Sequence, residues 1–326
     1  MVRPESAPEQ ARIKRRISSK KIFSLAALRP RQWTKNLVVF AAPLFAFNLS
    51  LQSIIGCLLA FVLFCCASSG FYLINDIADV ESDRQHPIKC KRPIAAGLVS
   101  IPAAIATSIV LLGAALSISW LRSPALGITL TSYVFLQIAY NLKLKHISIL
   151  DIVAIATGFV LRAYAGAAAT GIVLSAWFVL CTAMLALFLG IEKRKVELRF
   201  FEIRGGKTRA VIKCYSLPLL SRMESTVTTG AFMSYALWSA GPIVRGATTP
   251  WMMLTIPFVL YGIFRYQMLS DPKDIVSGTE NELGQGQYTE RPEEVLLTDR
   301  PILLTVISWI FTIFIILLLK QHGAIK

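Results

Sequence analysis

Charged side chains are scarce in this chain of 326 residues, because Asp, Glu, Lys and Arg together make up only 16% of it. A soluble domain carries about 25% of such residues, and 55% of this chain is hydrophobic. The high hydrophobic content also excludes a disordered chain, which cannot bury enough apolar surface to fold. We therefore expect a membrane protein rather than an ordinary soluble enzyme.

Residues for several kinds of chemistry are also few. The chain has three histidines, and its six cysteines form no CxxC pair and lie mostly in apolar runs. This argues against a zinc site or a disulfide framework and favours small buried hydrophobic side chains in a reducing compartment. The first 35 residues are basic and polar with no central apolar stretch, so no cleavable signal peptide is predicted.

Acidic residues are outnumbered, with 19 Asp and Glu against 34 Lys and Arg, for a formal net charge of +15. Such an excess is also typical of proteins that bind nucleic acid. In so apolar a chain it instead favours basic loops on the cytoplasmic side of a membrane. We predict a membrane as the partner and no nucleic acid.

Long apolar runs dominate the sequence, and a transmembrane helix needs about 20 such residues. The predicted fold class is all-α, a polytopic membrane protein with a bundle of nine transmembrane helices around a central cavity. Pro43 and Asn48 interrupt the first expected span, and Pro257 lies in the eighth, which is short. The nine expected spans are 36–52, 54–74, 101–121, 125–142, 149–169, 172–191, 225–244, 250–266 and 301–319.

The basic residues predict the orientation. If the N-terminus is cytoplasmic, the cytoplasmic segments hold 29 Lys and Arg and the opposite side holds 4, as the positive-inside rule requires. All the acidic residues fall on the cytoplasmic side as well. We therefore expect a multi-pass protein of the cell (inner) membrane, with the N-terminus and any active site in the cytoplasm.

Two segments lie outside the expected bundle. Residues 1–35 form a basic cytoplasmic arm, which either lies on anionic lipid headgroups or is a free tail. Residues 36–326 form the transmembrane catalytic domain, with a cytoplasmic loop at about 267–300. This loop carries eight acidic residues and three glycines, and we expect it to act as a flexible cover.

The most informative local pattern is the run of carboxylates in NDIADVESD at 75–83. Asp76, Asp79 and Asp83 are spaced i, i+3 and i+7, so a helix would place them along one face. Oxygen-only ligands suit Mg²⁺, which usually binds a few carboxylates together with substrate phosphates. Basic residues such as Lys89 and Arg92 follow directly, and this order predicts a site for a magnesium diphosphate.

A second charged group, EKRKVEL, follows the sixth expected span at 192–198. Glu197 is either a second metal carboxylate flanked by the cations Lys193 and Arg194, or part of an amphipathic helix end. Lys143 and Lys145 are either phosphate ligands or topology anchors. Arg162 lies inside the fifth expected span, where a lipid-facing arginine would cost at least about 2.5 kcal/mol, so it faces either a functional cavity or a structural partner.

These residues resemble a known family. NDIADVESD is similar to the NDxxDxxxD signature of the UbiA superfamily of intramembrane prenyltransferases. Other segments resemble its decaprenyl-phosphate phosphoribosyltransferase branch, and the resemblance covers almost the whole chain beyond residue 25. The chain has no second DxxxD motif, and EKRKVEL stands in its place. The segments that resemble this branch are RPRQWTKN, HPIKCKRPIAAG, YNLKLKH, DIVAIATGFVLRAYAG, EKRKVEL and PEEVLLTDRP.

The resemblance implies transfer of 5-phosphoribosyl from phosphoribosyl pyrophosphate to a polyprenyl phosphate of the decaprenyl type, with release of pyrophosphate and Mg²⁺ as cofactor. One alternative is a UbiA-type prenyltransferase that moves an isoprenoid from its diphosphate to an aromatic acceptor. Another is a transporter, although transport sites lie near the membrane midplane and the polar residues here gather at one face.

The expected site residues follow from the motif and the resemblance together. Those expected to hold Mg²⁺ and take part in catalysis are Asp76, Asp79, Asp83 and Glu197. Those expected to bind the substrates are Lys35, Asn75, Lys89, Arg92, Tyr140, Lys143, Lys145, Arg162, Lys193 and Arg194.

Overall fold

The computed structural model describes residues 26–47, 50–85, 89–204, 210–244, 246–270 and 298–325. Within these ranges the chain is helical and contains no strand, which confirms the predicted all-α class. The long helices are α3 (Leu51–Ala78), α5 (Ile101–Arg122), α6 (Pro124–Leu142), α7 (Leu150–Thr170), α8 (Ala176–Arg204), α9 (Leu217–Ser239), α10 (Ile256–Ser270) and α13 (Arg300–Gln321).

Short helices connect the long ones or precede them. Before α3 come the 3-10 helix η1 (Pro30–Phe40) and α2 (Ala41–Phe45), and α4 (Val80–Arg84) follows α3 directly. The remaining short elements are η2 (Lys89–Lys91), η3 (Leu144–His146), η4 (Ala210–Cys214), η5 (Pro242–Val244) and η6 (Pro250–Thr255).

Side-chain caps and prolines mark where several helices begin. The Ser123 hydroxyl accepts a hydrogen bond from the amide of Leu126 at 3.2 Å, and Pro124 occupies the first position of α6. Asp299 caps α13 in the same way, 2.9 Å from the amide of Ile302. Such caps satisfy amides that have no partner inside the helix, and proline is tolerated there because its missing N–H is not needed.

Seven helical segments within the described residues are long and apolar enough to cross a membrane, which supports the polytopic prediction. They are Leu51–Ala78, Ile101–Arg122, Pro124–Leu142, Leu150–Thr170, Ala176–Glu202, Pro250–Ser270 and Arg300–Gln321. The expected number of nine is not confirmed. The span expected at 225–244 falls largely within α9, which is not among the seven and carries the charged residues Arg222 and Glu224 near its start.

The first expected span, 36–52, is not a regular membrane-crossing helix. Among its described residues, 36–40 belong to η1, 41–45 to the five-residue helix α2 and 51–52 to the start of α3. Pro43 in α2 lacks a backbone donor. The segment packs into the bundle against α7. A Cβ atom added at Gly166 of α7 would lie only 1.9 Å from the carbonyl oxygen of Val39. The apolar run at 36–45 therefore serves internal packing.

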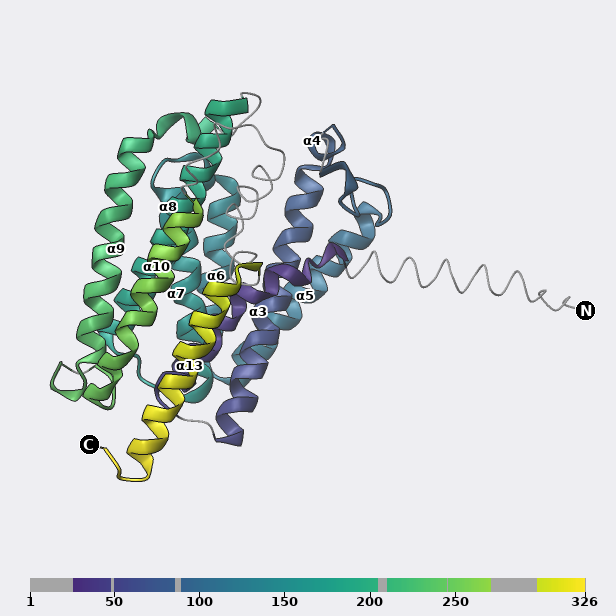
Figure 1. The fold of residues 1–326 in the computed structure, drawn as a ribbon. Coiled ribbons are helices and arrows are strands. Elements are labelled where there is room, and N and C mark those ends of the chain that lie inside the picture. The colour runs from purple at the N-terminus through teal and green to yellow at the C-terminus, as the bar shows by residue number, and fades with distance from the viewer. Residues whose placement is uncertain are drawn as a thin grey trace, which may run out of the picture.

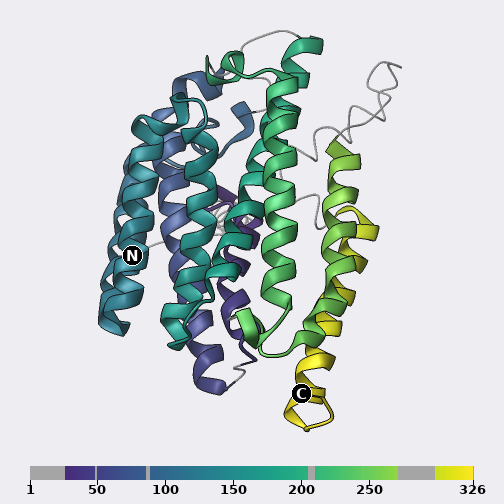
Figure 2. The same ribbon diagram turned by 90° about the vertical axis from the view of Figure 1, so that its left-hand side faces the viewer.

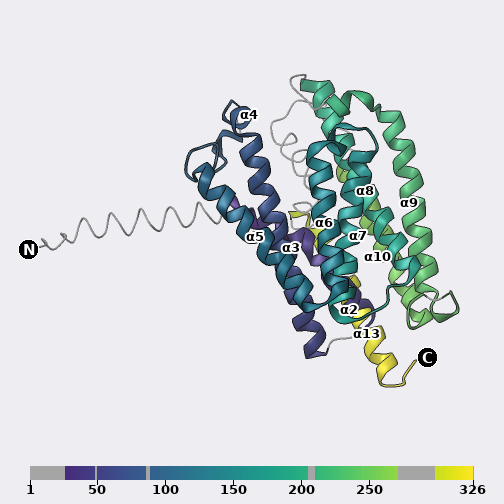
Figure 3. The same cartoon turned by 180° about the vertical axis from the view of Figure 1, so that it is seen from behind.

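The long helices form one bundle in which neighbours run in alternate directions (Figures 1 and 2). Packed pairs include α3 with α5, α6 with α7, α7 with α8, α8 with α9, and α10 with α13. Figure 3 shows the same bundle from behind, with α6, α7 and α8 side by side. One end of the bundle carries α4, and we call it the α4 end. The end of α8 and the starts of α7 and α9 also lie there.

Small residues allow close packing between helices. The run from Ala163 to Ala169 lies on α7, and Ala163, Ala165 and Ala167 are buried. A Cβ atom added at Gly56 of α3 would lie 2.7 Å from the carbonyl oxygen of Ala169. Small side chains at these contacts let backbones approach closely, as in other membrane bundles.

The boundaries expected for the two outer segments are only partly described. Residues 1–25 and 271–297, which include most of the basic arm and most of the acidic loop, lie outside the described residues. The boundary expected at residue 35 falls inside η1, which packs against α3 and α7. The packed part of the chain therefore begins before residue 36.

Candidate active site

Asp76 and Asp83 come together at the α4 end, as their spacing predicted. Asp76 lies in the last turn of α3 and Asp83 lies in α4, and both are 2% exposed. Nη1 of Arg92 contacts both carboxylates, at 3.2 Å from Asp76 and 2.6 Å from Asp83. One cationic nitrogen therefore bridges two buried carboxylates that are seven residues apart.

Arg29 is a partner that the sequence prediction missed. Its guanidinium forms a salt bridge with Asp76 and lies over the ring of Tyr72, with 5.1 Å between its Cζ and the ring centroid. Arg29 precedes η1 and has a positive φ of 53°. It is the first residue of the RPRQWTKN segment, so membership in that segment was the only signal that could have marked it.

The other predicted residues near the aspartates are more exposed. Asp79 lies between α3 and α4 and is exposed, and Asn75 in α3 is half-buried. Lys89, in η2, is exposed as well. The i, i+3, i+7 spacing thus brings Asp76 and Asp83 to one buried cation, whereas Asp79 faces outward.

A second cluster surrounds Arg194 near the end of α8. The side chain of Arg194 is fully buried, and its Nε donates to Oδ2 of Asp151 at 2.7 Å. Its Nη1 forms a salt bridge with Glu197, one turn further along α8. The hydroxyl of Tyr215 donates to Oδ1 of Asp151 at 2.7 Å. Arg194 and Glu197 are therefore in direct contact, as their i, i+3 spacing allows.

The Arg194 cluster retains unused donor capacity. Nη2 of Arg194 is buried and has no hydrogen-bond partner among the residues that the structure describes, and the same holds for Nδ2 of Asn141 at the end of α6. A buried donor without a partner costs free energy, and a charged one costs more. Lys193, the preceding residue on α8, is half-buried. The chemistry of this cluster fits an anionic ligand.

The candidates between α6 and α7 lie at the same end of the bundle. Tyr140 is half-buried near the end of α6, and Lys143 directly follows that helix and is exposed. Lys145 lies in η3 and is half-buried. Because α6 ends where α7 begins, these side chains belong to the α4 end, together with Asp151.

Arg162 has a different environment from the one expected of a phosphate ligand. It is 6% exposed, and each of its three guanidinium nitrogens donates to a protein acceptor. The acceptors are Oδ1 of Asn36 at 2.7 Å, the carbonyl of Gly158 at 2.8 Å and the hydroxyl of Tyr133 at 3.0 Å. The Cζ atom of Arg162 also lies 4.9 Å from the centroid of the Tyr133 ring. This arrangement favours the structural role that the sequence had left open.

A third buried ion network lies between α8, α9 and α10. Nζ of Lys195 lies 3.2 Å from Glu192 and also contacts Glu224, and Gln267 donates to Glu224 at 2.6 Å. Glu192 and Lys195 belong to the EKRKVEL segment and contact each other within α8, whereas Glu224 comes from α9. Together with Gln267, these charges link α8, α9 and α10.

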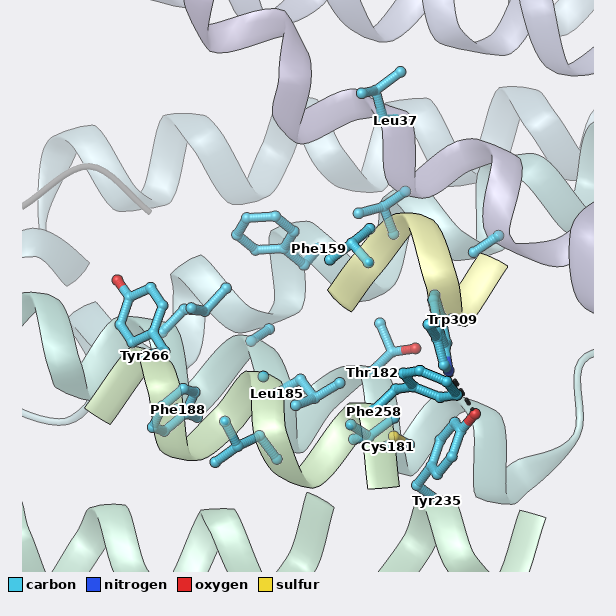
Figure 4. Close-up of a pocket in the computed structure, with 18 of the residues that line it drawn as sticks. Leu37, Phe159, Cys181, Thr182, Leu185, Phe188, Tyr235, Phe258, Tyr266 and Trp309 are labelled. Atoms are coloured by element: carbon cyan, nitrogen blue, oxygen red, sulfur yellow. Dashed lines mark hydrogen bonds between the residues drawn. The ribbon is translucent and has the colours of Figure 1, made fainter. Parts of the chain in front are cut away.

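An apolar cavity of about 600 Å³ lies between η1, α7, α8, α9, α10 and α13. Figure 4 shows its lining, which includes Phe159, Phe188 and Trp309, and a hydrogen bond of 2.9 Å from the Trp309 indole to the Tyr235 hydroxyl. Lys35 also lines the cavity, and its Nζ donates to Gln32 at 2.6 Å. The volume is typical of a ligand pocket, and the lining suits a hydrocarbon chain with an anionic head.

The carboxylates at the α4 end fit a divalent cation in part. Asp76 and Asp83 already share one cationic nitrogen, and their oxygen ligands suit Mg²⁺. Across the described ranges, however, no three His, Cys, Asp or Glu side chains are grouped closely enough to hold one ion. Glu197 contacts Arg194 instead. The structure thus brings together two of the four expected metal ligands.

Curated relatives match this chain along most of its length. Decaprenyl-phosphate phosphoribosyltransferase of Corynebacterium glutamicum is 36% identical over 298 residues, covering 89% of this chain and 85% of the relative. The enzyme of the same name from Mycolicibacterium smegmatis is 38% identical over 302 residues, covering 89% of this chain and 90% of the relative.

Solved structures share the fold. A UbiA homolog from Archaeoglobus fulgidus bound to DMAPP and Mg²⁺ matches with a TM-score of 0.62 at 19% identity, covering 89% of this chain and 97% of that one. A UbiA homolog from Aeropyrum pernix K1 matches with a TM-score of 0.53 at 13% identity, covering 85% and 97%. The model of the UbiA prenyltransferase family matches residues 36–280. This multi-pass membrane protein therefore belongs to the UbiA prenyltransferase family.

Proposed function

We propose that the protein transfers 5-phosphoribosyl from phosphoribosyl pyrophosphate to a polyprenyl phosphate of the decaprenyl type and releases pyrophosphate. The names of the curated relatives support this reaction. The observation that carries it is the pairing of two clusters of arginines and buried carboxylates, around Arg92 and Arg194, with an apolar cavity lined by Lys35. A soluble phosphorylated donor and a lipid acceptor need both features.

On the donor side, Asp76 and Asp83 would hold Mg²⁺, with Asp79 and Asn75 nearby. Bound Mg²⁺ would neutralise the negative charge that develops on the departing pyrophosphate. Binding of the metal requires Arg92 to move toward the phosphates, because its guanidinium now lies between the two carboxylates. In that position Arg92 would form charge-assisted hydrogen bonds with the diphosphate.

The remaining basic side chains at the α4 end would complete the donor site. Lys89, Lys193 and Arg194 would bind donor phosphates, and Glu197 would hold Arg194 or reach the metal. Arginine is suited to this task because its planar group presents several donors in a fixed geometry. Arg162 is left out of the proposed substrate contacts because Asn36, Gly158 and Tyr133 occupy its three nitrogens.

On the acceptor side, the isoprenoid units nearest the phosphate would lie in the apolar cavity, with Lys35 at the phosphate. Ile302 and Trp309 line the cavity seven residues apart on α13, so it extends roughly 10 Å along that helix at 1.5 Å per residue. The phosphate of either substrate would also be contacted by Tyr140, Lys143 and Lys145.

The proposed reaction breaks the bond between the anomeric carbon of ribose and the pyrophosphate oxygen. An oxygen of the acceptor phosphate forms the new bond to that carbon, through a transition state with oxocarbenium character. A phosphate is already anionic near neutral pH, so no general base is needed. The side chains would act by positioning the two substrates and stabilising charge.

The proposed orientation places the α4 end at the cytoplasmic face of the cell (inner) membrane. The charge asymmetry of the loops supports this orientation through the positive-inside rule. It also places the donor site where a soluble, anionic, cytosolic substrate has access.

The main alternative is transfer of an isoprenoid from its diphosphate to an aromatic acceptor, which the family match and the apolar cavity also permit. A partition assay separates the two reactions. Purified protein is incubated with Mg²⁺, polyprenyl phosphate and phosphoribosyl pyrophosphate labelled in the ribose, and the lipid is then extracted. Label in the lipid phase with matching release of pyrophosphate is expected. Label that stays in water, together with prenylation of an aromatic acceptor in a parallel incubation that supplies a polyprenyl diphosphate, would reject the proposal.

Asp83→Asn tests the metal assignment. Removing one charge from the Asp76–Asp83 pair should lower Mg²⁺-dependent transfer by at least about 100-fold, because the metal stabilises the leaving group by several kcal/mol. The matched control is Glu81→Gln in the same short helix, whose side chain is 85% exposed. The control should keep wild-type activity. Full Mg²⁺-dependent activity in Asp83→Asn would show that Asp83 is not a metal ligand.

A further inference from the structure

We infer that Asp151 and Tyr215 are positioning residues that fix the Arg194 guanidinium for a phosphate of the donor. The inference rests on the proposed function. Neither residue was among the predicted site residues, and both lie in the buried part of the Arg194 cluster. Oδ2 of Asp151 accepts from Nε of Arg194 at 2.7 Å, and Oδ1 accepts from the Tyr215 hydroxyl at 2.7 Å. Both oxygens of one buried carboxylate are therefore engaged.

The Tyr215 hydroxyl makes a second contact that fixes the start of α7. It accepts a hydrogen bond of 2.6 Å from the backbone amide of Ile149. Ile149 has a φ of 71°, a conformation that a β-branched residue adopts only under constraint from its surroundings. Strained residues of this kind persist where other contacts hold them, and they cluster at functional sites. Tyr215 thus holds the backbone two residues before Asp151.

Tyr215 is the donor in its hydrogen bond with Asp151, because a carboxylate oxygen can only accept. Burial raises the pKa of the Tyr215 phenol well above its ordinary value, so the hydroxyl keeps its proton at neutral pH and donates to the carboxylate. The second oxygen of Asp151 is then left to Arg194. A chain of three contacts connects the Ile149 amide with the Arg194 guanidinium through Tyr215 and Asp151.

This chain determines which donor of Arg194 is left for a ligand. Asp151 holds Nε and Glu197 holds Nη1, while Nη2 has no partner among the described residues and is buried. Because the guanidinium is planar and rigid, two fixed nitrogens also fix the direction of the third. The ligand that fits is an anion with oxygen acceptors, such as a phosphate of phosphoribosyl pyrophosphate.

A positioning role predicts kinetics that a purely structural link between α7 and residues 210–216 would not. Tyr215→Phe keeps the ring and removes both hydrogen bonds of the hydroxyl. We expect the KM for phosphoribosyl pyrophosphate to rise about 10-fold, because small misplacements of a binding group cost this much or more. The KM for polyprenyl phosphate should stay within about twofold of the wild-type value.

Tyr133→Phe is the matched control, since it removes a hydroxyl that contacts the other buried arginine, Arg162, at 3.0 Å. It should lower the melting temperature without changing the donor KM. Asp151→Asn is the second variant and should raise the donor KM as Tyr215→Phe does. In an Arg194→Lys background, Tyr215→Phe should have no further effect on the donor KM, because coupled residues are not additive.

The outcomes separate this inference from the proposed function. If the wild-type protein transfers no phosphoribosyl group, the proposed function fails. If the wild type transfers it and folded Tyr215→Phe or Asp151→Asn has the wild-type donor KM, only the positioning role is overturned. Equal effects of Tyr215→Phe in the wild-type and Arg194→Lys backgrounds would also overturn it. If Tyr215→Phe does not fold, Asp151→Asn decides by the same measurement.

Discussion

Two arginines are buried in adjacent helices of this bundle, and their surroundings differ in kind. Arg162 of α7 is held by neutral groups, the amide of Asn36, the carbonyl of Gly158 and the hydroxyl of Tyr133, which engage all three of its nitrogens. Arg194 of α8 is held by two carboxylates, and its third nitrogen has no partner in the described part of the chain.

The difference teaches that burial of a cation does not by itself mark a functional site. A buried arginine in which every nitrogen already donates to a protein acceptor has little left to offer a ligand. One with a buried nitrogen that has no acceptor carries a free-energy cost that a ligand can remove. The surroundings of the two residues agree with this distinction. Arg194 lies at the charged α4 end beside Glu197, while Arg162 packs against the aromatic rings of Phe64, Tyr133 and Phe159.

The largest effect is expected from Arg194→Lys. Lysine keeps the charge but cannot hold two carboxylates and a phosphate with one planar group. We expect phosphoribosyl transfer to fall about 100-fold, the range found when a preorganised charge-stabilising donor is lost. Steady-state kinetics of the purified, folded variant measures this. Activity within twofold of wild type would remove Arg194 from the substrate site and the contrast with Arg162 would disappear.

A smaller effect on activity and a clear effect on stability are expected from Arg162→Lys. An ammonium group cannot engage Asn36, Gly158 and Tyr133 together, so buried acceptors lose their partner at a cost of about 2–3 kcal/mol. The melting temperature should fall, and the activity of the protein that remains folded should stay within about threefold of wild type. A normal melting temperature with a large loss of donor affinity would reverse the roles assigned to the two arginines.

The smallest effect is expected where an arginine–carboxylate pair reaches the solvent. Arg265 and Asp299 form a salt bridge at 2.8 Å with side chains 24% and 14% exposed. The hydrogen bond from Arg265 lowers the pKa of Asp299. Its stabilisation is therefore present above the unfolded-state pKa of about 4 and is lost as the pH falls through the lower folded-state value.

Asp299→Asn isolates this contribution because asparagine can still cap α13. Exposed pairs contribute about 0.2–1 kcal/mol, so the variant should melt slightly below wild type at pH 7. The two proteins should converge as the pH falls toward 3. A difference in melting temperature that is constant between pH 7 and pH 3 would mean that the charge of Asp299 contributes nothing.

The fold was largely predictable from apolar runs. The prediction of a membrane span at 36–52 failed for a physical reason. Length and hydropathy locate a helix that crosses a membrane, but they cannot tell it from an apolar segment that packs inside the bundle. Residues 30–45 are of the second kind, because Val39 and Asn36 are fully buried against the rest of the bundle. The partner that requires this arrangement, Gly166, lies more than 120 residues away.

The site was predictable where its residues are neighbours in sequence. The spacing of Asp76 and Asp83 and of Arg194 and Glu197 followed from helical geometry. The contacts that cross between helices did not, since no local pattern connects Arg29 with Asp76 or Tyr215 with Asp151. The sequence left the role of Arg162 open for the same reason, because its contact with Asn36 joins α7 to η1.

Donor binding to the two arginine variants tests the central claim most directly. Phosphoribosyl pyrophosphate with Mg²⁺ is titrated calorimetrically into wild type, Arg194→Lys and Arg162→Lys, each reconstituted in lipid nanodiscs and shown to be folded. The account predicts that the wild type and Arg162→Lys bind with similar affinity and that Arg194→Lys binds at least about 10-fold more weakly. Equal affinities in all three proteins, or no binding to the wild type, would contradict it.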